Sequence, residues 1–292
     1  MVRSAEPRFG CPSHRNPPRR GAALSHGHHT ARHGQTPTRS IGCDHSVGGP
    51  GMSAVLELRG VSKSYGEGPA RVDALVDIDL SVTEGHLVAV MGPSGSGKST
   101  LLTIAGGLEE PGHGEVLVAG APLSVMSMND KAALRRRVVG YVFQDYNLLP
   151  GLTAVENVSV PLELDGLSAR RARVAGLAAL EQLGLRGRAD HFPDQLSGGE
   201  RQRAAIARAI VGERRLLLAD EPSGALDSAN GDAVMNLIRS ACRQGVAAVV
   251  VTHDAGLASL ADDIVFIRDG RMTTAGGVSQ ASDHDNAKGP RQ

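Results

Sequence analysis

Short apolar runs with the periodicity of strands alternate along the chain with segments of helical spacing. Apolar and polar residues alternate over 55–59, 61–65 and 74–82, which predicts half-buried strands in an antiparallel lead-in, and turn residues fill 66–69. Leu87–Met91 is apolar throughout and predicts a strand buried on both faces. The ordered part of the chain is therefore expected to open with strands.

The second half of the chain continues this alternation of strand and helix. Apolar runs at 216–219 and 247–251 each stop at polar residues, as strands of a covered parallel sheet do. Helical spacing is found at 231–242, between these runs, and at 100–105, after the first core strand. The pattern predicts an α/β fold.

The middle of the chain has a different amino-acid composition. Residues 152–194 contain no β-branched run, and Ala, Leu and Arg dominate 168–183. We expect a helical subdomain, at about 146–211, inserted into the sheet. After Met272 the chain turns to Thr, Gly, Ser and Asp, which predicts a flexible polar tail over 273–292.

Charge separates the first 51 residues from the rest. The whole chain of 292 residues has 31 basic and 31 acidic side chains, but residues 1–51 carry a net charge of +5 and the remainder −5. The leader, 1–51, is rich in His, Arg and Pro and too poor in apolar residues to fold, so we expect disorder there. Its Cys and His residues are zinc-ligand types, yet their irregular spacing favours either a disordered tail or a misassigned start codon (Cys11, His14, His26, His28, His29, His33, Cys43, His45). Our hypothesis is that translation starts at Met52.

The remaining body, 52–272, has the size of one domain. Its apolar runs are far shorter than the roughly 18–20 residues that span a bilayer, and the leader lacks the apolar region of a signal peptide. Cys242 is the only thiol in the body, as suits a reducing compartment. We expect a cytoplasmic protein, and its acidic body argues against nucleic acid as a partner.

Residues 92–99, Gly-Pro-Ser-Gly-Ser-Gly-Lys-Ser, match a phosphate-binding loop at every fixed position. Glycines let the backbone wrap a phosphate so that successive N–H groups and the next helix's N-terminus point at the anion. Lys98 would neutralise phosphate charge and Ser99 would ligate Mg²⁺. The alternative, a plain glycine turn, is disfavoured because the loop follows a buried strand and precedes a helix.

Two adjacent carboxylates, Asp220 and Glu221, end the apolar run at 216–219. Ionised carboxylates at a strand end need a partner, which a Mg²⁺-nucleotide supplies. Asp220 would hold the metal and Glu221 would act as general base on the attacking water. Two solvated acids at an ordinary strand end are the alternative.

A second candidate anion site precedes the helical stretch 201–210. The segment Leu-Ser-Gly-Gly-Glu at 196–200 places Ser197, Gly198 and Gly199 at a helix N-terminus, where the dipole favours an anion. A simple Ser N-cap is the alternative. With this segment, the sequence resembles the ATP-binding subunit of an ABC transporter, whose signature is Leu-Ser-Gly-Gly-Glu.

The resemblance covers roughly residues 55–272. It implies a P-loop NTPase core, a RecA-like mixed sheet flanked by helices, with an antiparallel β subdomain and an inserted helical subdomain. It also implies a head-to-tail homodimer that closes over two Mg-ATP and drives a separate transmembrane permease from the inner face of the plasma membrane. In that family the signature of one subunit closes over the ATP of the other, which would explain two anion sites in one chain.

Site residues follow from the same resemblance. It implies adenine stacking by Tyr65, contact of Gln144 with Mg²⁺, the attacking water and the permease, a dimer-crossing segment at Asp227, and contact of His253 with the γ-phosphate. Catalysis would rest on Glu221, His253 and Gln144, and the metal on Ser99, Gln144 and Asp220. ATP would be bound by a larger set (Tyr65, Gly92, Pro93, Ser94, Gly95, Ser96, Gly97, Lys98, Ser99, Thr100, Ser197, Gly198, Gly199, Asp227).

Segments at 143–150, 152–157 and 221–228 further resemble the branch of lipoprotein-releasing, macrolide-export and antimicrobial-peptide-resistance ATPases. The expected function is therefore ATP hydrolysis for an exporter or a force-transmitting system. A compact ABC importer is one alternative. A soluble ABC protein acting on ribosomes or DNA is another, although such proteins carry two cassettes or long coiled coils and this chain has one phosphate loop.

Overall fold

The computed structural model describes residues 54–222 and 228–274. The leader, Asp227 and most of the predicted tail lie outside these ranges. The strands are β1 (Ala54–Tyr65), β2 (Val72–Thr83), β3 (Leu87–Met91), β4 (His113–Val118), β5 (Ala121–Pro122), β6 (Val139–Val142), β7 (Leu216–Asp220), β8 (Ala247–Val251), β9 (Asp263–Arg268) and β10 (Arg271–Thr274). The helices are α1 (Lys98–Ala105), α2 (Met128–Arg137), α3 (Ala154–Leu164), α4 (Ala169–Gln182), α5 (Gly198–Ile210), α6 (Ser228–Arg243) and α7 (Ala255–Ala258).

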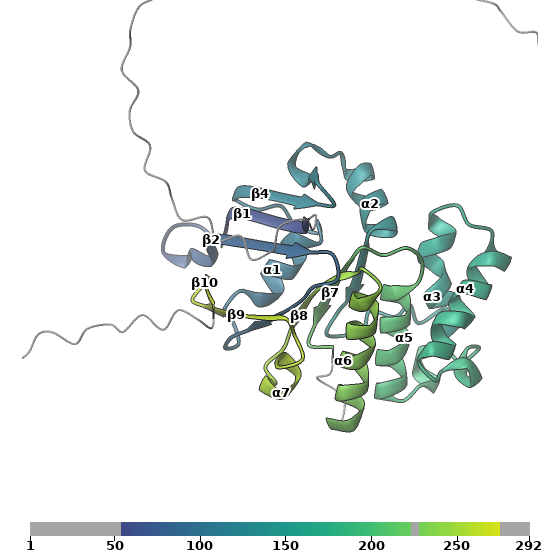
Figure 1. The fold of residues 1–292 in the computed structure, drawn as a ribbon. Helices are drawn as coiled ribbons and strands as arrows, with labels where there is room; N and C mark the ends of the chain where they lie inside the picture. Colours follow the sequence, from purple (N-terminus) through teal and green to yellow (C-terminus); the bar gives the residue numbers. More distant parts are fainter. Residues whose placement is uncertain (1–53, 223–227, 275–292) are drawn as a thin grey trace, which may run out of the picture. The chain divides into compact units, whose positions relative to one another are not determined.

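A six-stranded sheet in the order β10-β9-β3-β8-β7-β6 forms the centre of the fold (Figure 1). All neighbours pair in parallel except the β9–β10 hairpin. The apolar runs at 87–91, 216–219 and 247–251 are three adjacent strands of this sheet, and their residues are almost all buried. The predicted α/β core is confirmed.

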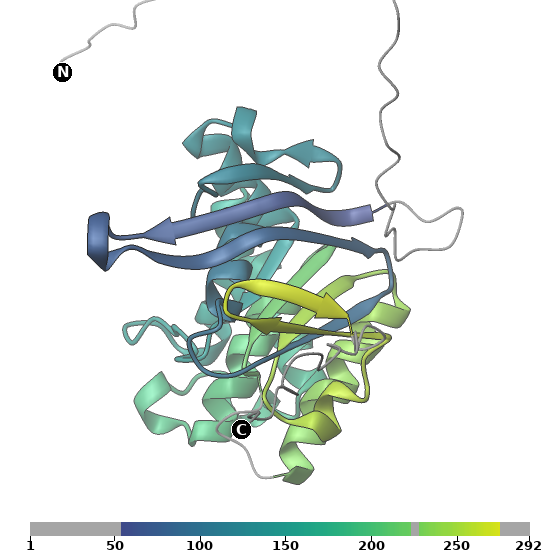
Figure 2. The ribbon, with the colours of Figure 1, turned by 90° about the vertical axis from the view of Figure 1, so that its left-hand side faces the viewer.

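A second, antiparallel sheet has the order β2-β1-β4-β5 and lies above the β9–β10 hairpin in Figure 2. Side chains of both sheets and of α1 form one apolar cluster, which includes Ile78, Leu101 and Val249. The two stretches at 55–59 and 61–65 belong to one strand, β1, whose pairing with β2 is irregular between them. Gly60 lies at this irregularity with φ 56° and donates its N–H to the Asp79 carboxylate.

Helices α3, α4 and α5 pack around their own apolar cluster, centred on Val155, Leu180 and Ala204. They form the helical part expected at about 146–211 and lie beside the central sheet in Figure 1. On that side α5 and α6 also cover the sheet, through Ile206, Met235 and Ile238. Within the described ranges, no helix combines the length and the apolar character that crossing a membrane requires.

The sequence patterns missed β4, β5, β9 and β10. One prediction needs correction, because the polar tail was expected to begin at 273, yet Thr273 and Thr274 pair with Phe266 and Val265 in β10. Both threonines are β-branched and suit the edge of a sheet, so hydrogen bonding to β9 outweighs their polarity. Cys242 is buried, as a small apolar residue would be.

Candidate functional site

Four segments that carry the predicted chemistry leave the central sheet at one edge. The phosphate loop follows β3, His253 follows β8, Asp220 and Glu221 end β7, and Gln144 follows β6. These strands are parallel neighbours, so their carboxyl ends meet, which is where open α/β sheets bind ligands. Strand pairing thus assembles residues that lie more than 150 positions apart.

The phosphate loop needs its glycines for steric reasons. A Cβ on Gly92 would lie 2.1 Å from the Ile267 carbonyl oxygen, and one on Gly97 would lie 2.2 Å from that of Ala74. Both glycines have positive φ, of 152° and 106°. Gly97 ends the loop as the N-cap of α1. The loop backbone can therefore follow this path only without side chains at these two positions.

Donors at the loop fit an anionic ligand. Ser96 is 4% exposed, and its hydroxyl has no hydrogen-bond partner among the described residues. The Lys98 ammonium bonds the carbonyl oxygens of Gly92 and Pro93, at 2.9 and 2.8 Å, and no carboxylate of the described ranges forms an ion pair with it. Buried polar groups normally have partners, so an orphaned hydroxyl beside a lysine is consistent with a loop that receives phosphate oxygens.

Asp220 is almost fully buried at the end of β7. The pKa of its carboxyl is raised, mainly by burial and further by the charge of Glu221, while the nearby Ser99 hydroxyl and the charge of Lys98 oppose the rise. Ser99 and Asp220 thus lie close enough to each other to ligate one cation. A hydroxyl and a carboxylate are oxygen donors of the kind Mg²⁺ prefers.

Glu221 and His253 face each other across neighbouring strands. His253 Nδ1 lies 3.0 Å from a carboxylate oxygen of Glu221. This hydrogen bond, followed by the carboxylate's charge, raises the pKa of His253. Glu221 has a left-handed backbone, with φ 48°, and its N–H donates to the Val251 carbonyl at 3.0 Å. The β7–β8 pairing therefore holds the predicted base beside the predicted histidine.

A cavity of about 730 Å³ lies over these residues. It is large enough for a nucleotide-sized ligand. Predicted site residues from four separate segments line it (Ser94, Gln144, Glu221, His253). Five residues that were not predicted complete the lining (Asp145, Tyr146, Leu148, Pro193, Arg201).

Tyr65 ends β1, and its hydroxyl lies near Thr100 at the start of α1. The pKa of the phenol is raised, first by burial and then by its bond to Glu109, while Thr100 lowers it. The residue is 41% exposed, so its side chain is not part of the apolar core. The phenol donates to Glu109 at 2.7 Å, and the Lys63 ammonium lies 5.4 Å from the ring centroid. The ring is therefore held near the loop with much of its surface available for stacking.

The signature segment does not line its own chain's cavity. Ser197 caps α5, accepting from the Glu200 N–H at 3.3 Å, while the Glu200 carboxylate accepts from the Ser197 N–H at 2.8 Å. Ser197, Gly198 and Gly199 are exposed or half-buried. The alternative of an N-cap is thus correct as local structure, and it leaves the helix N-terminus open to a second ligand.

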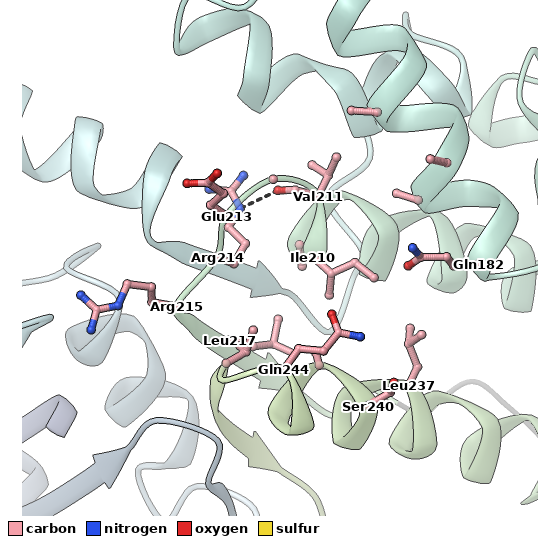
Figure 3. A pocket seen from close by; sticks show the side chains of 17 residues that line it. Gln182, Ile210, Val211, Glu213, Arg214, Arg215, Leu217, Leu237, Ser240 and Gln244 are labelled. Atoms are coloured by element: carbon pink, nitrogen blue, oxygen red, sulfur yellow. Dashed lines mark hydrogen bonds between the residues drawn. The ribbon is translucent and has the colours of Figure 1, made fainter. Parts of the chain in front are cut away.

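A second hollow, of about 640 Å³, lies at the opposite end of the strands (Figure 3). It is bounded by the end of α5, the start of β7 and the side of α6, and Ile210, Leu237 and Gln244 are among the side chains lining it. Arg214 at its rim bonds the Val211 carbonyl, and Arg215 pairs with Glu84. None of the predicted site residues lines this hollow.

Polar side chains around the site are also among the residues that the sequence patterns did not predict. Arg201 lines the cavity, Arg208 bonds the turn after Gln144, and Asn157 bonds the loop at Leu149–Thr153. Arg201 could have been found from the sequence, because a cation close to a helix N-terminus is unfavourable with the helix dipole unless an anion is near. The other two bond mainly to main-chain atoms, which no sequence pattern marks.

Comparison with known proteins identifies the family to which this fold belongs. The family model for ABC transporters matches residues 75–224, about half of the chain. The chain belongs to the ABC transporter family. It is an ABC ATPase, and its ABC cassette fold is that of a P-loop NTPase.

Among its ABC relatives, an uncharacterized ABC transporter ATP-binding protein of Methanocaldococcus jannaschii is 43% identical over 75% of this chain and 97% of its own length. The macrolide export ATP-binding/permease protein MacB of Photorhabdus laumondii is 43% identical over 78% of this chain. This chain spans about a third of the length of that protein, with 35% covered.

A solved ABC structure supports the same assignment. The dimeric post-hydrolysis state of the ATP-binding cassette MJ0796, bound to ADP and Pi, superposes with a TM-score of 0.71 at 39% identity. The superposition covers 75% of this chain and 98% of that one. That cassette is described as a dimer holding the products of ATP hydrolysis.

Proposed function

We propose that this chain is the nucleotide-binding subunit of an ABC transporter, that two copies close over two Mg-ATP, and that hydrolysis drives a membrane permease. The observation that carries the proposal is the division of the site. Glu221, His253 and Gln144 surround one cavity, whereas Ser197 at the start of α5 lies outside it. A second copy supplying its signature would complete the site.

Each residue has a distinct task in this proposal. The phosphate loop and Lys98 bind the phosphates, and Ser99 and Asp220 hold the cation, with Gln144 as a further ligand. Bound Mg²⁺ would neutralise charge that develops on the phosphates. Glu221 accepts a proton from water at its carboxylate, and His253 orients that carboxylate through their 3.0 Å hydrogen bond.

The glutamate's role is tested by Glu221→Gln. The amide keeps the shape of the side chain but cannot accept the proton, so turnover should fall by roughly 10²–10⁴-fold while ATP still binds. The variant should form a dimer with ATP, seen by size-exclusion chromatography with light scattering. Glu213→Gln, the same change at an exposed site far from the cavity, should behave as the parent chain. Retained turnover in Glu221→Gln would refute the assignment.

The permease is proposed to dock in an apolar cleft of about 400 Å³ formed by α2, β6 and α3. The cleft is lined by Tyr141, Phe143, Pro161 and Leu164, and the two aromatic rings stack with centroids 4.1 Å apart. Leu164 is 66% exposed. The relatives named as ATP-binding/permease proteins combine both parts in one chain, so a cytoplasmic permease segment is the occupant this proposal names.

Docking is tested by placing a photo-crosslinking amino acid at position 164 in the host's membranes. A crosslink to an integral membrane protein is expected. The same probe at Val72, which is 63% exposed on β2 outside the cleft, is the matched control and should give none. A crosslink to ribosomal protein, or equal products at both positions, would contradict the permease.

The exporter branch is proposed from the macrolide-export relatives, with lipoproteins, peptides or antibiotics as the substrate classes. A compact importer is the second candidate, and both would use the same ATPase site. The permease captured at position 164 distinguishes them, because four membrane-spanning helices with a large extracytoplasmic domain would support the exporter branch.

A further inference from the structure

The turn that follows Gln144 forms a wall shared by two cavities. Gln144, Asp145 and Tyr146 line the 730 Å³ cavity at the proposed ATP site, and the next residue, Asn147, lines the apolar cleft of α2, β6 and α3. A segment of four consecutive residues thus separates the proposed site of hydrolysis from the proposed docking cleft. The position of this short backbone segment decides where Gln144 lies.

The turn has an unfavourable backbone. Tyr146 and Asn147 are both left-handed, with φ of 62° and 47°. Left-handed backbone costs roughly 1–2 kcal/mol for a residue with a Cβ, although asparagine tolerates it better. Two local bonds close the turn, from Tyr146 N–H to Phe143 at 3.0 Å and from Asn147 N–H to Asp145 at 2.7 Å. Two successive left-handed residues persist only where the surroundings hold them.

Arg208, near the end of α5, supplies that support. Its Nη1 donates to the Asn147 carbonyl at 2.5 Å and its Nη2 to the Tyr146 carbonyl at 2.7 Å. The planar guanidinium matches two adjacent carbonyls as a single ammonium cannot. Among the described residues no carboxylate pairs with Arg208, and both of its terminal nitrogens bond the turn.

Helix α5 also carries the signature at its other end. Ser197 is its N-cap, and at 1.5 Å per residue Arg208 lies roughly 16 Å further along the axis. One rigid helix therefore joins the segment offered to the partner's nucleotide and the clamp on the Gln144 turn.

We propose that Arg208 is a positioning residue for hydrolysis. Its guanidinium clamps the turn to α5 and so holds Gln144 in register with the signature of the same chain. The inference rests on the proposed function, because it assumes that Gln144 contacts the cation and the attacking water. Arg208 itself touches neither.

The experiment is a double-mutant cycle of Arg208 and Gln144 in the full chain, read as steady-state ATP hydrolysis. Arg208→Met should lower kcat by roughly 10–100-fold, the scale on which misplaced groups act, and change KM for ATP by less than about threefold. Arg208→Lys should recover part of the loss. In a Gln144→Ala background, Arg208→Met should lower kcat less than about twofold further. Arg171→Met, an exposed arginine on α4, is the control.

The outcomes separate the inference from the function it rests on. Additive losses in the cycle would overturn the role of Arg208, and so would an unchanged kcat in Gln144→Ala. If Arg208→Met does not fold, as judged by circular dichroism, the cycle is run with Arg208→Lys, and additivity again overturns the inference. Absence of ATP hydrolysis in the parent chain would instead refute the proposed function.

Discussion

Asn157 on α3 offers the sharpest test of how the loop beyond Gln144 is held. Its side chain is fully buried, accepts from the Leu149 N–H at 2.7 Å, and donates to the carbonyls of Leu149, Leu152 and Thr153 at 3.0, 2.9 and 3.1 Å. The prediction concerns Asn157→Ala, which removes all four bonds and leaves the helix backbone intact.

The size of the effect follows from which partners remain. The Leu149 carbonyl keeps a bond from the Leu152 N–H, and the Thr153 carbonyl keeps one from the Asn157 N–H. Two groups are orphaned, the Leu149 N–H and the Leu152 carbonyl. At about 1–3 kcal/mol each, reduced because water reaches this loop, the free energy of unfolding should fall by about 2–3 kcal/mol. For a domain of this size that lowers Tm by about 4–12 °C.

The assay is urea unfolding followed by circular dichroism, with Asn236→Ala as control. Asn236 is exposed on α6, so its replacement should change the free energy of unfolding by less than about 0.5 kcal/mol. Asn157→Asp keeps the acceptor but turns a carboxylate toward carbonyl oxygens, and should destabilise at least as much at neutral pH. A loss below about 1 kcal/mol in Asn157→Ala would refute the reasoning.

Two further predictions concern the site. Glu221 raises the pKa of His253, so the pair stabilises the fold below the histidine's ordinary pKa and loses this effect as pH rises through the raised value; Glu221→Gln should return that pKa toward about 6.5 in an NMR titration, and an unchanged pKa would contradict the contact. Gly97→Ala would place Cβ 2.2 Å from the Ala74 carbonyl and should weaken binding of a fluorescent ATP analogue at least tenfold. Gly95→Ala meets nothing within 4 Å and should weaken it less.

Sequence patterns predicted the strands that are buried on both faces. Leu87–Met91 and Ala247–Val251 coincide with β3 and β8, because a strand covered on both faces of its sheet is apolar at nearly every position. Strands near the periphery were missed. His113–Val118 begins with two exposed residues, one of them Gly114 at φ 87°, so its pattern is weak and its pairing with β1 decides its conformation.

Site residues could be predicted from the sequence where the type of side chain itself indicates its chemistry. Lys98, Asp220 and Glu221 stand out because charged residues beside apolar strands need a partner. Contacts that depend on strand pairing could not be predicted from the sequence, since Glu221 contacts His253 only because β7 and β8 pair. Arg208 was invisible for another reason, because it bonds carbonyl oxygens that every residue possesses.

The left-handed backbone at Glu221 implies a trade-off between stability and activity at this position. Glycine adopts φ 48° without the steric cost that a Cβ imposes, so a glycine here would relax the end of β7. It would also delete the carboxylate that the proposed reaction needs. Selection for a more stable cassette therefore runs against selection for turnover at this one position, and laboratory evolution of the chain under heat alone would be expected to yield folded, inactive variants changed at residue 221.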